Sequence, residues 1–227
     1  MGAQCTSVAS AFVLQFGCET LNKPRGTGRS WRERQERDPY VQHARRDGWR
    51  SRAVYKLQQI DDKEHLLRPG IVCVDLGAAP GSWSQYVTTK LKGRVRLIAV
   101  DLLPMDALDS VEYIQGDFAD PKFLESLQEK LGGDRVDLVM SDMAPNMSGN
   151  WTIDQPRAMH LAELALEFCD RVLASGGNFV CKVFQGDGFD AFVTAARRSF
   201  ERVKVIKPKA SRPGSREVYL VARNYQL

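Results

Sequence analysis

The sequence has no apolar run that approaches the roughly 20 residues needed to span a lipid bilayer. It also lacks the basic start of a secretory signal and the arginine-rich composition of an organelle transit peptide. We therefore expect a cytoplasmic protein without a membrane partner. The length of 227 residues and the 43% of hydrophobic residues fit one domain with a sizeable core.

Metal ligands and paired thiols are equally scarce. The five cysteines form no C-x-x-C pair, and the three histidines lie far apart along the chain. This scatter gives no indication of a zinc site or a disulfide framework, so we expect no metal. The residues concerned are Cys5, Cys18, Cys73, Cys169, Cys181, His43, His65 and His160.

The positive charge is concentrated in two segments, although the net charge is only +4. Residues 23–56 hold eleven Lys and Arg against four acids, and residues 197–216 hold eight against one, so the rest of the chain is acidic on balance. Two basic segments on an otherwise acidic protein predict a polyanionic partner that binds at these two segments. Together they favour a nucleic acid over a small-molecule substrate.

The same patterns divide the chain into three parts. Residues 1–22 carry a single charge and no clear helical or strand period, and we expect a disordered tail. Residues 23–50 form a basic arm. Residues 51–227 form the main domain, and nothing in the sequence favours more than a monomer.

After residue 70, apolar runs rich in β-formers alternate with helical runs. This alternation predicts a doubly wound, mostly parallel α/β sheet of seven strands, of the Rossmann-like type. We also expect a helical stretch over 40–60, and we expect Gly176-Gly177 to end the helix before them. The predicted strands are 71–76, 95–101, 111–114, 136–141, 177–184, 203–206 and 218–222, and the predicted helices are 82–91, 121–131, 155–173 and 189–200.

A glycine-rich turn, DLGAAPGSW at 75–83, follows the first predicted strand. Ligands of such sheets bind beyond the carboxyl ends of the strands. A dinucleotide fingerprint that starts at Gly77 would place its second glycine at Ala79, whose methyl group argues against a bound pyrophosphate. No Gly-Lys-Ser/Thr of a phosphate-binding loop occurs either. What remains is a nucleoside cofactor without a pyrophosphate, as in S-adenosylmethionine.

Acidic residues end the next three predicted strands. Asp101 stands where a carboxylate can accept hydrogen bonds from both hydroxyls of a ribose. Asp117 could accept from an adenine amino group, although an aspartate there is by itself explained equally well as a turn residue. Asp142 ends the fourth strand. Acids at successive strand ends are hard to explain by capping alone.

The choice of methyl acceptor depends on residues farther along the chain. A cytosine-C5 enzyme needs a cysteine close to the site, and none lies between Cys73 and Cys169. An enzyme acting on exocyclic amines would have an aromatic residue after Pro145, where Asn146 stands instead. Lys182 interrupts an apolar strand, and a lysine is rarely buried without a partner or a task.

Four motifs are together similar to those of the FtsJ/RrmJ family of ribosomal RNA large-subunit methyltransferases. They are DLGAAPG (75–81), SDMAPNMSG (141–149), KVFQG (182–186) and SREVY (215–219), and the resemblance runs from about Arg50 to Tyr219. Ser82 departs from it, since many relatives have glycine there, and residues 1–22 match nothing in it.

The resemblance implies a domain of the S-adenosylmethionine-dependent methyltransferase type that modifies the ribose 2′-oxygen of a uridine in 23S ribosomal RNA, within the large (50S) subunit. The runner-up substrate is tRNA or another RNA such as a messenger RNA cap. RNA contact is expected through 23–56 and 197–216. By motif, the family's catalytic tetrad corresponds to Lys56, Asp142, Lys182 and Glu217, and its cofactor contacts correspond to Gly81, Trp83, Asp101, Asp117 and Asp142.

A ribose hydroxyl is a weak nucleophile, so the site must either remove its proton or stabilise the developing alkoxide. Our hypothesis is that Lys182 acts as the base or directs the hydroxyl through its charge, while Lys56 and Asp142 position it. Trp83 can be a wall of the cofactor pocket or a helix-packing core residue, and Glu217 can be catalytic or a surface acid. A non-catalytic RNA-binding module would be expected to lack the two lysines or Asp142, and all are present.

Overall fold

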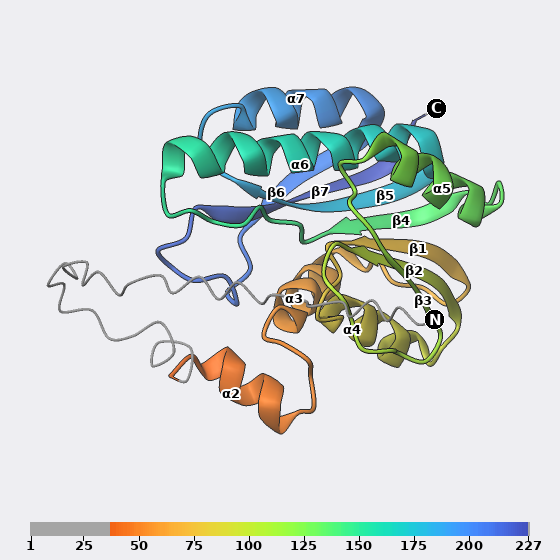
Figure 1. Cartoon of the computed structure of the whole chain (residues 1–227), viewed down its shortest axis with the longest axis horizontal. Coiled ribbons are helices and arrows are strands. Elements are labelled where there is room, and N and C mark those ends of the chain that lie inside the picture. The colour runs from red at the N-terminus through yellow and green to blue at the C-terminus, as the bar shows by residue number, and fades with distance from the viewer. Residues whose placement is uncertain (1–36, 227) are drawn as a thin grey trace, which may run out of the picture.

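Seven strands form one sheet in the order β3-β2-β1-β4-β5-β7-β6 (Figure 1). Six of them run parallel, and β7 alone is antiparallel to both of its neighbours. The structure, a computed structural model, describes residues 37–226. The predicted seven-stranded, mostly parallel sheet is confirmed. Its strands are β1 (Ile71–Leu76), β2 (Val95–Asp101), β3 (Val111–Gln115), β4 (Val136–Ser141), β5 (Leu173–Phe184), β6 (Phe200–Ile206) and β7 (Glu217–Tyr225).

Helices cover both faces of this sheet, as Figure 1 shows. The helices α3 (Val54–Glu64) and α4 (Ser82–Leu91) pack on one face. The other face is covered by α5 (Pro121–Leu131), α6 (Trp151–Val172) and α7 (Phe189–Ser199). Because both faces are covered, the central strands are apolar along their length rather than alternating, as expected for a parallel sheet.

The predicted tail, residues 1–22, and residues 23–36 of the predicted arm lie outside the described residues. The remainder of the arm contains α2 (Pro39–Arg46), which begins at Asp38, whose side chain accepts from Tyr40 N. The prediction of one helical stretch over 40–60 is wrong: α2 ends at Arg46, and Gly48 takes a positive φ of 75° before α3 begins. A tertiary contact holds this break open, because Gln85 of α4 donates to the Gly48 carbonyl.

The glycine pair at 176–177 does not end the preceding helix. α6 ends at Val172, and Leu173 already has extended dihedrals and pairs with Val136 across the sheet. The glycines lie inside β5, where the pairing register shifts between Val136 and Leu138. Leu173 is fully buried, and this packing outweighs the helix-ending preference of the glycines.

A buried carboxylate fastens the end of α3 to α4. Asp61 accepts hydrogen bonds from Leu66 N at 2.8 Å and Leu67 N at 3.0 Å, and it pairs with Lys90 of α4. The Asp61 side chain is fully buried, so these contacts replace the water that would otherwise solvate its charge. The pairing sets how α3 lies against α4, and α3 carries Lys56.

Replacing Asp61 should therefore destabilise the whole domain. Asp61→Ala leaves two buried N–H groups without an acceptor, and we expect the free energy of unfolding to fall by about 3 kcal/mol. Urea denaturation measures the change. Asp62→Ala is the matched control, because the neighbouring Asp62 is exposed and should change stability by less than about 0.5 kcal/mol. Equal effects from the two variants would contradict this role for Asp61.

Candidate active site

A cavity of about 520 Å³ lies beyond the carboxyl ends of β1, β2, β3 and β4. The loops after these strands form most of its wall, and α6 closes one side. The lining residues are Gly77, Ala79, Val100, Asp101, Leu102, Leu103, Gly116, Asp117, Phe118, Asp142, Met143, Ala144, Pro145, Asn146, Arg157, His160 and Leu161. The cavity therefore stands where the sequence predicts a ligand, and its size fits a nucleoside with a short side chain.

Gly77 allows two of these loops to approach each other. It has a positive φ of 75°, and a Cβ atom built on it would lie 2.8–2.9 Å from the side chain and backbone of Met143. Any larger residue would push the β4 loop away from the β1 turn. The turn is also tied to β2, because Gly77 N and Ala78 N both donate to the Val100 carbonyl.

Asp101 has one lone pair left on each carboxylate oxygen. Its Oδ2 accepts from Ala79 N and its Oδ1 from Leu103 N, both at 2.8 Å, so the carboxylate braces the glycine-rich turn against the β2 loop. A carboxylate has about four acceptor sites, so two remain for the hydroxyls of a ribose. The predicted ribose contact thus fits the geometry.

Asp117 has one oxygen tied to its own loop and lines the cavity. Its Oδ1 accepts from Ala119 N at 2.9 Å, the turn arrangement that the sequence already allowed. Asp120 caps α5 through Lys122 N and does not line the cavity. Of these two acids, only Asp117 stands where it could meet a ligand.

A small hollow adjoins the large cavity and contains a buried acid. Asp75 is 1% exposed, its Oδ2 accepts from Ser84 Oγ at 2.6 Å, and its Oδ1 has no hydrogen-bond partner among residues 37–226. Burial raises the pKa of Asp75 to about 7, and the nearby charge of Asp142 adds to the rise. Two carboxyl groups beside one hollow form an electronegative pocket that suits a cationic group.

Arg50 fastens the basic arm to the rim of the cavity. Its guanidinium donates to the carbonyls of Pro80 at 3.0 Å, Asp106 at 2.7 Å and Ala107 at 2.7 Å. The same Arg50 packs over Gly81, where a Cβ would lie 2.7 Å from its Nη1. Gly81, with a positive φ of 101°, thus lets the arginine reach the loop that carries Leu102 and Leu103.

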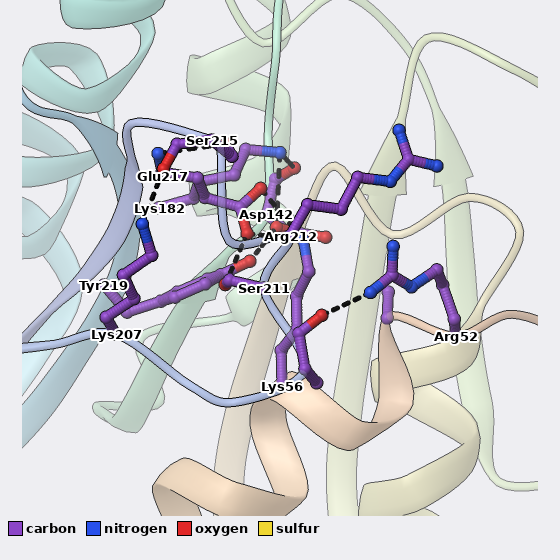
Figure 2. Close-up of polar contacts among 12 residues, drawn as sticks. Arg52, Lys56, Asp142, Lys182, Lys207, Ser211, Arg212, Ser215, Glu217 and Tyr219 are labelled. Carbon is purple, nitrogen blue, oxygen red and sulfur yellow. Dashed lines mark hydrogen bonds and ion pairs between the residues drawn. The ribbon is translucent and has the colours of Figure 1, made fainter. Parts of the chain in front are cut away.

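Beside the cavity, two lysines and two acids converge from four elements, as Figure 2 shows. Lys182 of β5 donates to the Asp142 carbonyl and lies 3.2 Å from Asp142 Oδ1. Lys56 of α3 contacts Glu217 of β7 at 2.8 Å. The side chains are only 8–18% exposed, so this four-residue cluster is largely shielded from water. The structure therefore brings the four predicted catalytic residues together.

Tyr219 links the two halves of the cluster. Its hydroxyl donates to Asp142 Oδ1 at 2.7 Å, and the Lys56 ammonium lies 5.6 Å from the centre of its ring. Burial and the charge of Asp142 raise the pKa of Tyr219 well above its ordinary value. Tyr219 is therefore a permanent hydrogen-bond donor to Asp142.

The electrostatics of the cluster keep Asp142 ionised. Burial alone would raise the pKa of Asp142, but the charges of Lys182 and Lys56 outweigh it, so that its pKa lies below the ordinary value. The negative charge of Asp142 is thus present throughout the neutral range. It faces both the large cavity and the lysines.

The loop between β6 and β7 supports Glu217 from behind. Ser211 Oγ donates to Glu217 Oε1 at 2.8 Å, and Ser215 Oγ accepts from Glu217 N at 3.1 Å (Figure 2). Ala210 in the same loop is held to the α3 side by Gln59, which accepts from its N–H. Lys56 contacts both carboxylate oxygens of Glu217, and Ser211 donates to one of them, so both oxygens have a partner.

Two predicted cofactor residues do not line the large cavity. Gly81 lies under Arg50, and Trp83 is 2% exposed, with its indole N–H donating to the Ala53 carbonyl and its ring packed on Tyr219. Trp83 borders only the small hollow next to Asp75. Its side chain leaves the first turn of α4 toward α3, so its geometry is that of a core residue.

Several residues of the site were missed from sequence. Tyr219 was seen only as part of a motif, although a tyrosine in an otherwise apolar strand signals a hydroxyl that needs a partner. Arg50 and Ser211 act through contacts between separate segments of the chain, and no local sequence pattern predicts such contacts. His160 is exposed and lines the cavity, and its isolated position in the sequence gave no sign of this.

Within residues 37–226, no group of three or more His, Cys, Asp or Glu is arranged to hold a metal ion. The helices of this part of the chain are also all too short or too polar to cross a membrane.

The model of the FtsJ-like methyltransferase family matches residues 49–225. The chain belongs to this family. The FtsJ-like match covers both cavities and all four members of the cluster, so the chain is a methyltransferase.

Individual FtsJ-like relatives are similar over nearly the whole chain. Ribosomal RNA large subunit methyltransferase E of Legionella pneumophila (strain Corby) is 52% identical over 201 residues, which cover 88% of this chain and 98% of that protein. The protein of the same name from Pseudomonas fluorescens (strain Pf0-1) is 51% identical over 200 residues, covering 88% and 96%. A crystal structure of a Plasmodium falciparum chain assigned as a ribosomal RNA methyltransferase matches with a TM-score of 0.71 at 29% identity, covering 78% and 98%.

The raised pKa of Asp75 predicts a pH-dependent cost to stability. Between about pH 4 and pH 7 the unfolded chain has released the Asp75 proton while the folded protein retains it, so stability attributable to this group is lost as pH rises through that window. The side chain of Asp75→Asn cannot ionise. The free energy of unfolding of this variant, relative to that of the parent, should therefore rise by about 2 kcal/mol between pH 5 and pH 8. Urea denaturation at both pH values measures the gain.

Asp109→Asn serves as the control, since Asp109 is exposed and should show the same difference from the parent at both pH values. A pH-independent difference for Asp75→Asn would show that its carboxyl is ionised without penalty in the folded protein.

Proposed function

We propose that this methyltransferase transfers a methyl group from S-adenosylmethionine to the ribose 2′-hydroxyl of a uridine in 23S ribosomal RNA, within the large ribosomal subunit. The observation that carries the proposal is the Lys182–Asp142 pair, which stands where the cavity meets a cluster of buried charges. A cytoplasmic location, a monomeric state and a catalytic domain over 51–227 with an RNA-contacting arm over 23–50 belong to the same proposal.

The residues of the cavity fit the proposed cofactor. Asp101 has a free acceptor site on each oxygen for the two ribose hydroxyls, and Asp117 Oδ2 is available to an adenine amino group. The unpartnered Oδ1 of Asp75 and the charge of Asp142 suit the positive charge of a sulfonium or an ammonium. Gly81 and Trp83 contribute indirectly, by placing Arg50 and by packing under the small hollow.

S-adenosylmethionine supplies a methyl group whose transfer breaks a carbon–sulfur bond, forms a carbon–oxygen bond and releases the hydroxyl proton to water. The protein's part is to hold the ribose hydroxyl in line and to stabilise the charge that develops on its oxygen. Lys182 is held by Asp142 beside the cavity, and its ammonium can donate to that oxygen. Asp142 and Tyr219 fix the position of Lys182, and Lys56 with Glu217 balances the charge of the cluster.

Charges around the cluster support an RNA substrate. Figure 2 shows the guanidinium groups of Arg52 and Arg212 on the same side of the four catalytic residues, and the Arg212 side chain is half exposed. Arg52 pairs closely with Asp38, so the Arg212 guanidinium is the more available of the two for a phosphate contact. Arg52 belongs to the segment 23–56 and Arg212 to the segment 197–216, so each basic segment contributes an arginine beside the cluster (Figure 2).

Removing the Lys182 ammonium should abolish turnover but leave the affinity for the cofactor nearly unchanged. Lys182→Ala should lower kcat by about 10²–10⁴-fold, because the developing charge on the 2′-oxygen loses its donor. The dissociation constant of S-adenosylmethionine, measured by calorimetry, should stay within about threefold, since Lys182 does not line the cavity. Lys122→Ala, on the exposed surface of α5, is the control and should keep full activity. Retained turnover in Lys182→Ala would rule out its assigned role.

The substrate can be identified by transfer of labelled methyl groups to free 23S RNA, large subunits and tRNA, followed by nucleoside analysis. We expect the label on a uridine ribose, with the large subunit or its RNA as the best acceptor. Binding should weaken roughly ten- to thirty-fold between 50 and 200 mM salt if about three phosphates are contacted. Label on a base, or preferential labelling of tRNA, would overturn the corresponding part of the proposal.

A further inference from the structure

A stack of three flat side chains lies next to the catalytic cluster without taking part in it. The guanidinium carbon of Arg216 stands 4.9 Å from the centre of the Trp151 ring. Trp151 in turn meets Phe184 edge to face, with ring centres 5.8 Å apart and planes at 79°. Arg216 directly precedes β7, Trp151 is the first residue of α6 and Phe184 is the last residue of β5.

The strand register places this stack beside the reacting groups. Phe184 follows Lys182 by two positions in β5, so both side chains leave the same face of the sheet about 7 Å apart. Phe184 pairs with Glu217 across the ladder, and Arg216 directly precedes Glu217. Arg216 and Trp151 therefore lie within reach of a nucleotide next to a ribose that is bound at Lys182.

The surface of the stack is open and its donors are unused. Arg216 is exposed and Trp151 is half-buried. Within residues 37–226, no carboxylate or carbonyl accepts a hydrogen bond from the Arg216 guanidinium, which is held by the indole ring alone. Met147 and Ile153, at 51% and 43%, are among the few large hydrophobic residues exposed in this part of the chain, and they flank Trp151 in sequence.

We propose that Trp151 and Arg216 form a stacking platform for an unpaired nucleobase adjacent to the methylated ribose, an inference that rests on the proposed RNA substrate. The base would lie on the outer face of the guanidinium, with the indole behind it. Arginine planes and aromatic rings are the surfaces on which single-stranded bases stack in RNA-binding proteins. The free N–H donors of Arg216 can reach the phosphate of the same nucleotide.

The platform explains how a site that recognises a ribose can select the nucleotide around it. A base inside a duplex keeps its neighbours as stacking partners and cannot lie on Arg216, whereas an unpaired base can. Stacking of the flanking base would fix the sugar–phosphate backbone on one side of the target. The 2′-hydroxyl would then be held in line with less freedom to rotate.

Two variants remove the platform and two keep part of it. Trp151→Ala and Arg216→Ala should weaken binding of a short single-stranded, uridine-containing RNA about 5- to 100-fold, the range for loss of one stacked base. Trp151→Phe retains a ring and should lose less. Arg216→Lys retains the charge but not the plane, and should bind nearly as weakly as Arg216→Ala. Arg94→Ala removes one exposed arginine at the opposite edge of the sheet and is the matched control for charge.

The same RNA with an abasic nucleotide next to the target tests the contact directly. Removing the base should weaken binding to the parent protein, and it should weaken binding to Arg216→Ala by much less, because that variant has already lost the guanidinium plane. Losses that add up in full would show that the base and Arg216 do not meet. Thermal unfolding and S-adenosylmethionine binding, both expected to match the parent, establish that each variant is folded.

The remaining outcomes separate this inference from the proposed function. Methylation of large subunits with unchanged affinity in Trp151→Ala and Arg216→Ala would overturn the platform and leave the proposed function standing. Weaker binding of these variants to whole subunits, but not to the RNA strand, would mean that the surface contacts a ribosomal protein and would also overturn it. Absence of methyl transfer from the parent protein to any RNA would instead reject the proposed function.

Discussion

Asp142 carries its charge at the point where the large cavity, the small hollow and the lysine cluster meet, and the arrangement of the site depends on that charge. A lone carboxylate in this position would be driven toward its neutral form by burial, as Asp75 is nearby. The charges of Lys182 and Lys56 prevent this, and Tyr219 donates a further hydrogen bond. Asp142 in turn holds the Lys182 ammonium through its carbonyl and its carboxylate.

The cluster as a whole carries two positive and two negative groups, so it can be largely dry without a net charge. Its neutrality depends on contributions from separate parts of the chain, because α3 supplies Lys56 and β7 supplies Glu217. The positions of α3 and of the β6–β7 loop consequently decide whether the charges of the cluster balance. Asp61 sets the first of them, and Ser211 with Ala210 sets the second.

The sequence was most informative where one residue is constrained by its own strand. Apolar runs located all seven strands because both faces of the sheet are covered, and acids at the strand ends located the cavity because parallel strands end at a common edge. Lys182 stood out since a charge in an apolar strand needs a reason. These inferences required only the periodicity of the chain.

Features that depend on contacts between segments were not predictable in the same way. The break between α2 and α3 is held by Gln85 from α4, and Leu173 leaves α6 early because it packs opposite Val136. Trp83 was expected to be either a wall of the cofactor pocket or a core residue, and the direction of its side chain follows from how α3 lies beside α4. The partners of Arg50 are 30 to 57 residues away in sequence.

The reversed direction of β7 has a practical consequence. The parallel strands β1, β2, β4 and β5 bring residues to the site near their carboxyl ends. By contrast, β7 brings Glu217 to it at its first position and then runs away from the cavity to Tyr225, at the opposite end of the strands. A label or an affinity handle joined after β7 would therefore lie on the side remote from the cavity. The enzyme can be anchored to a surface by that side with the cavity facing the solution.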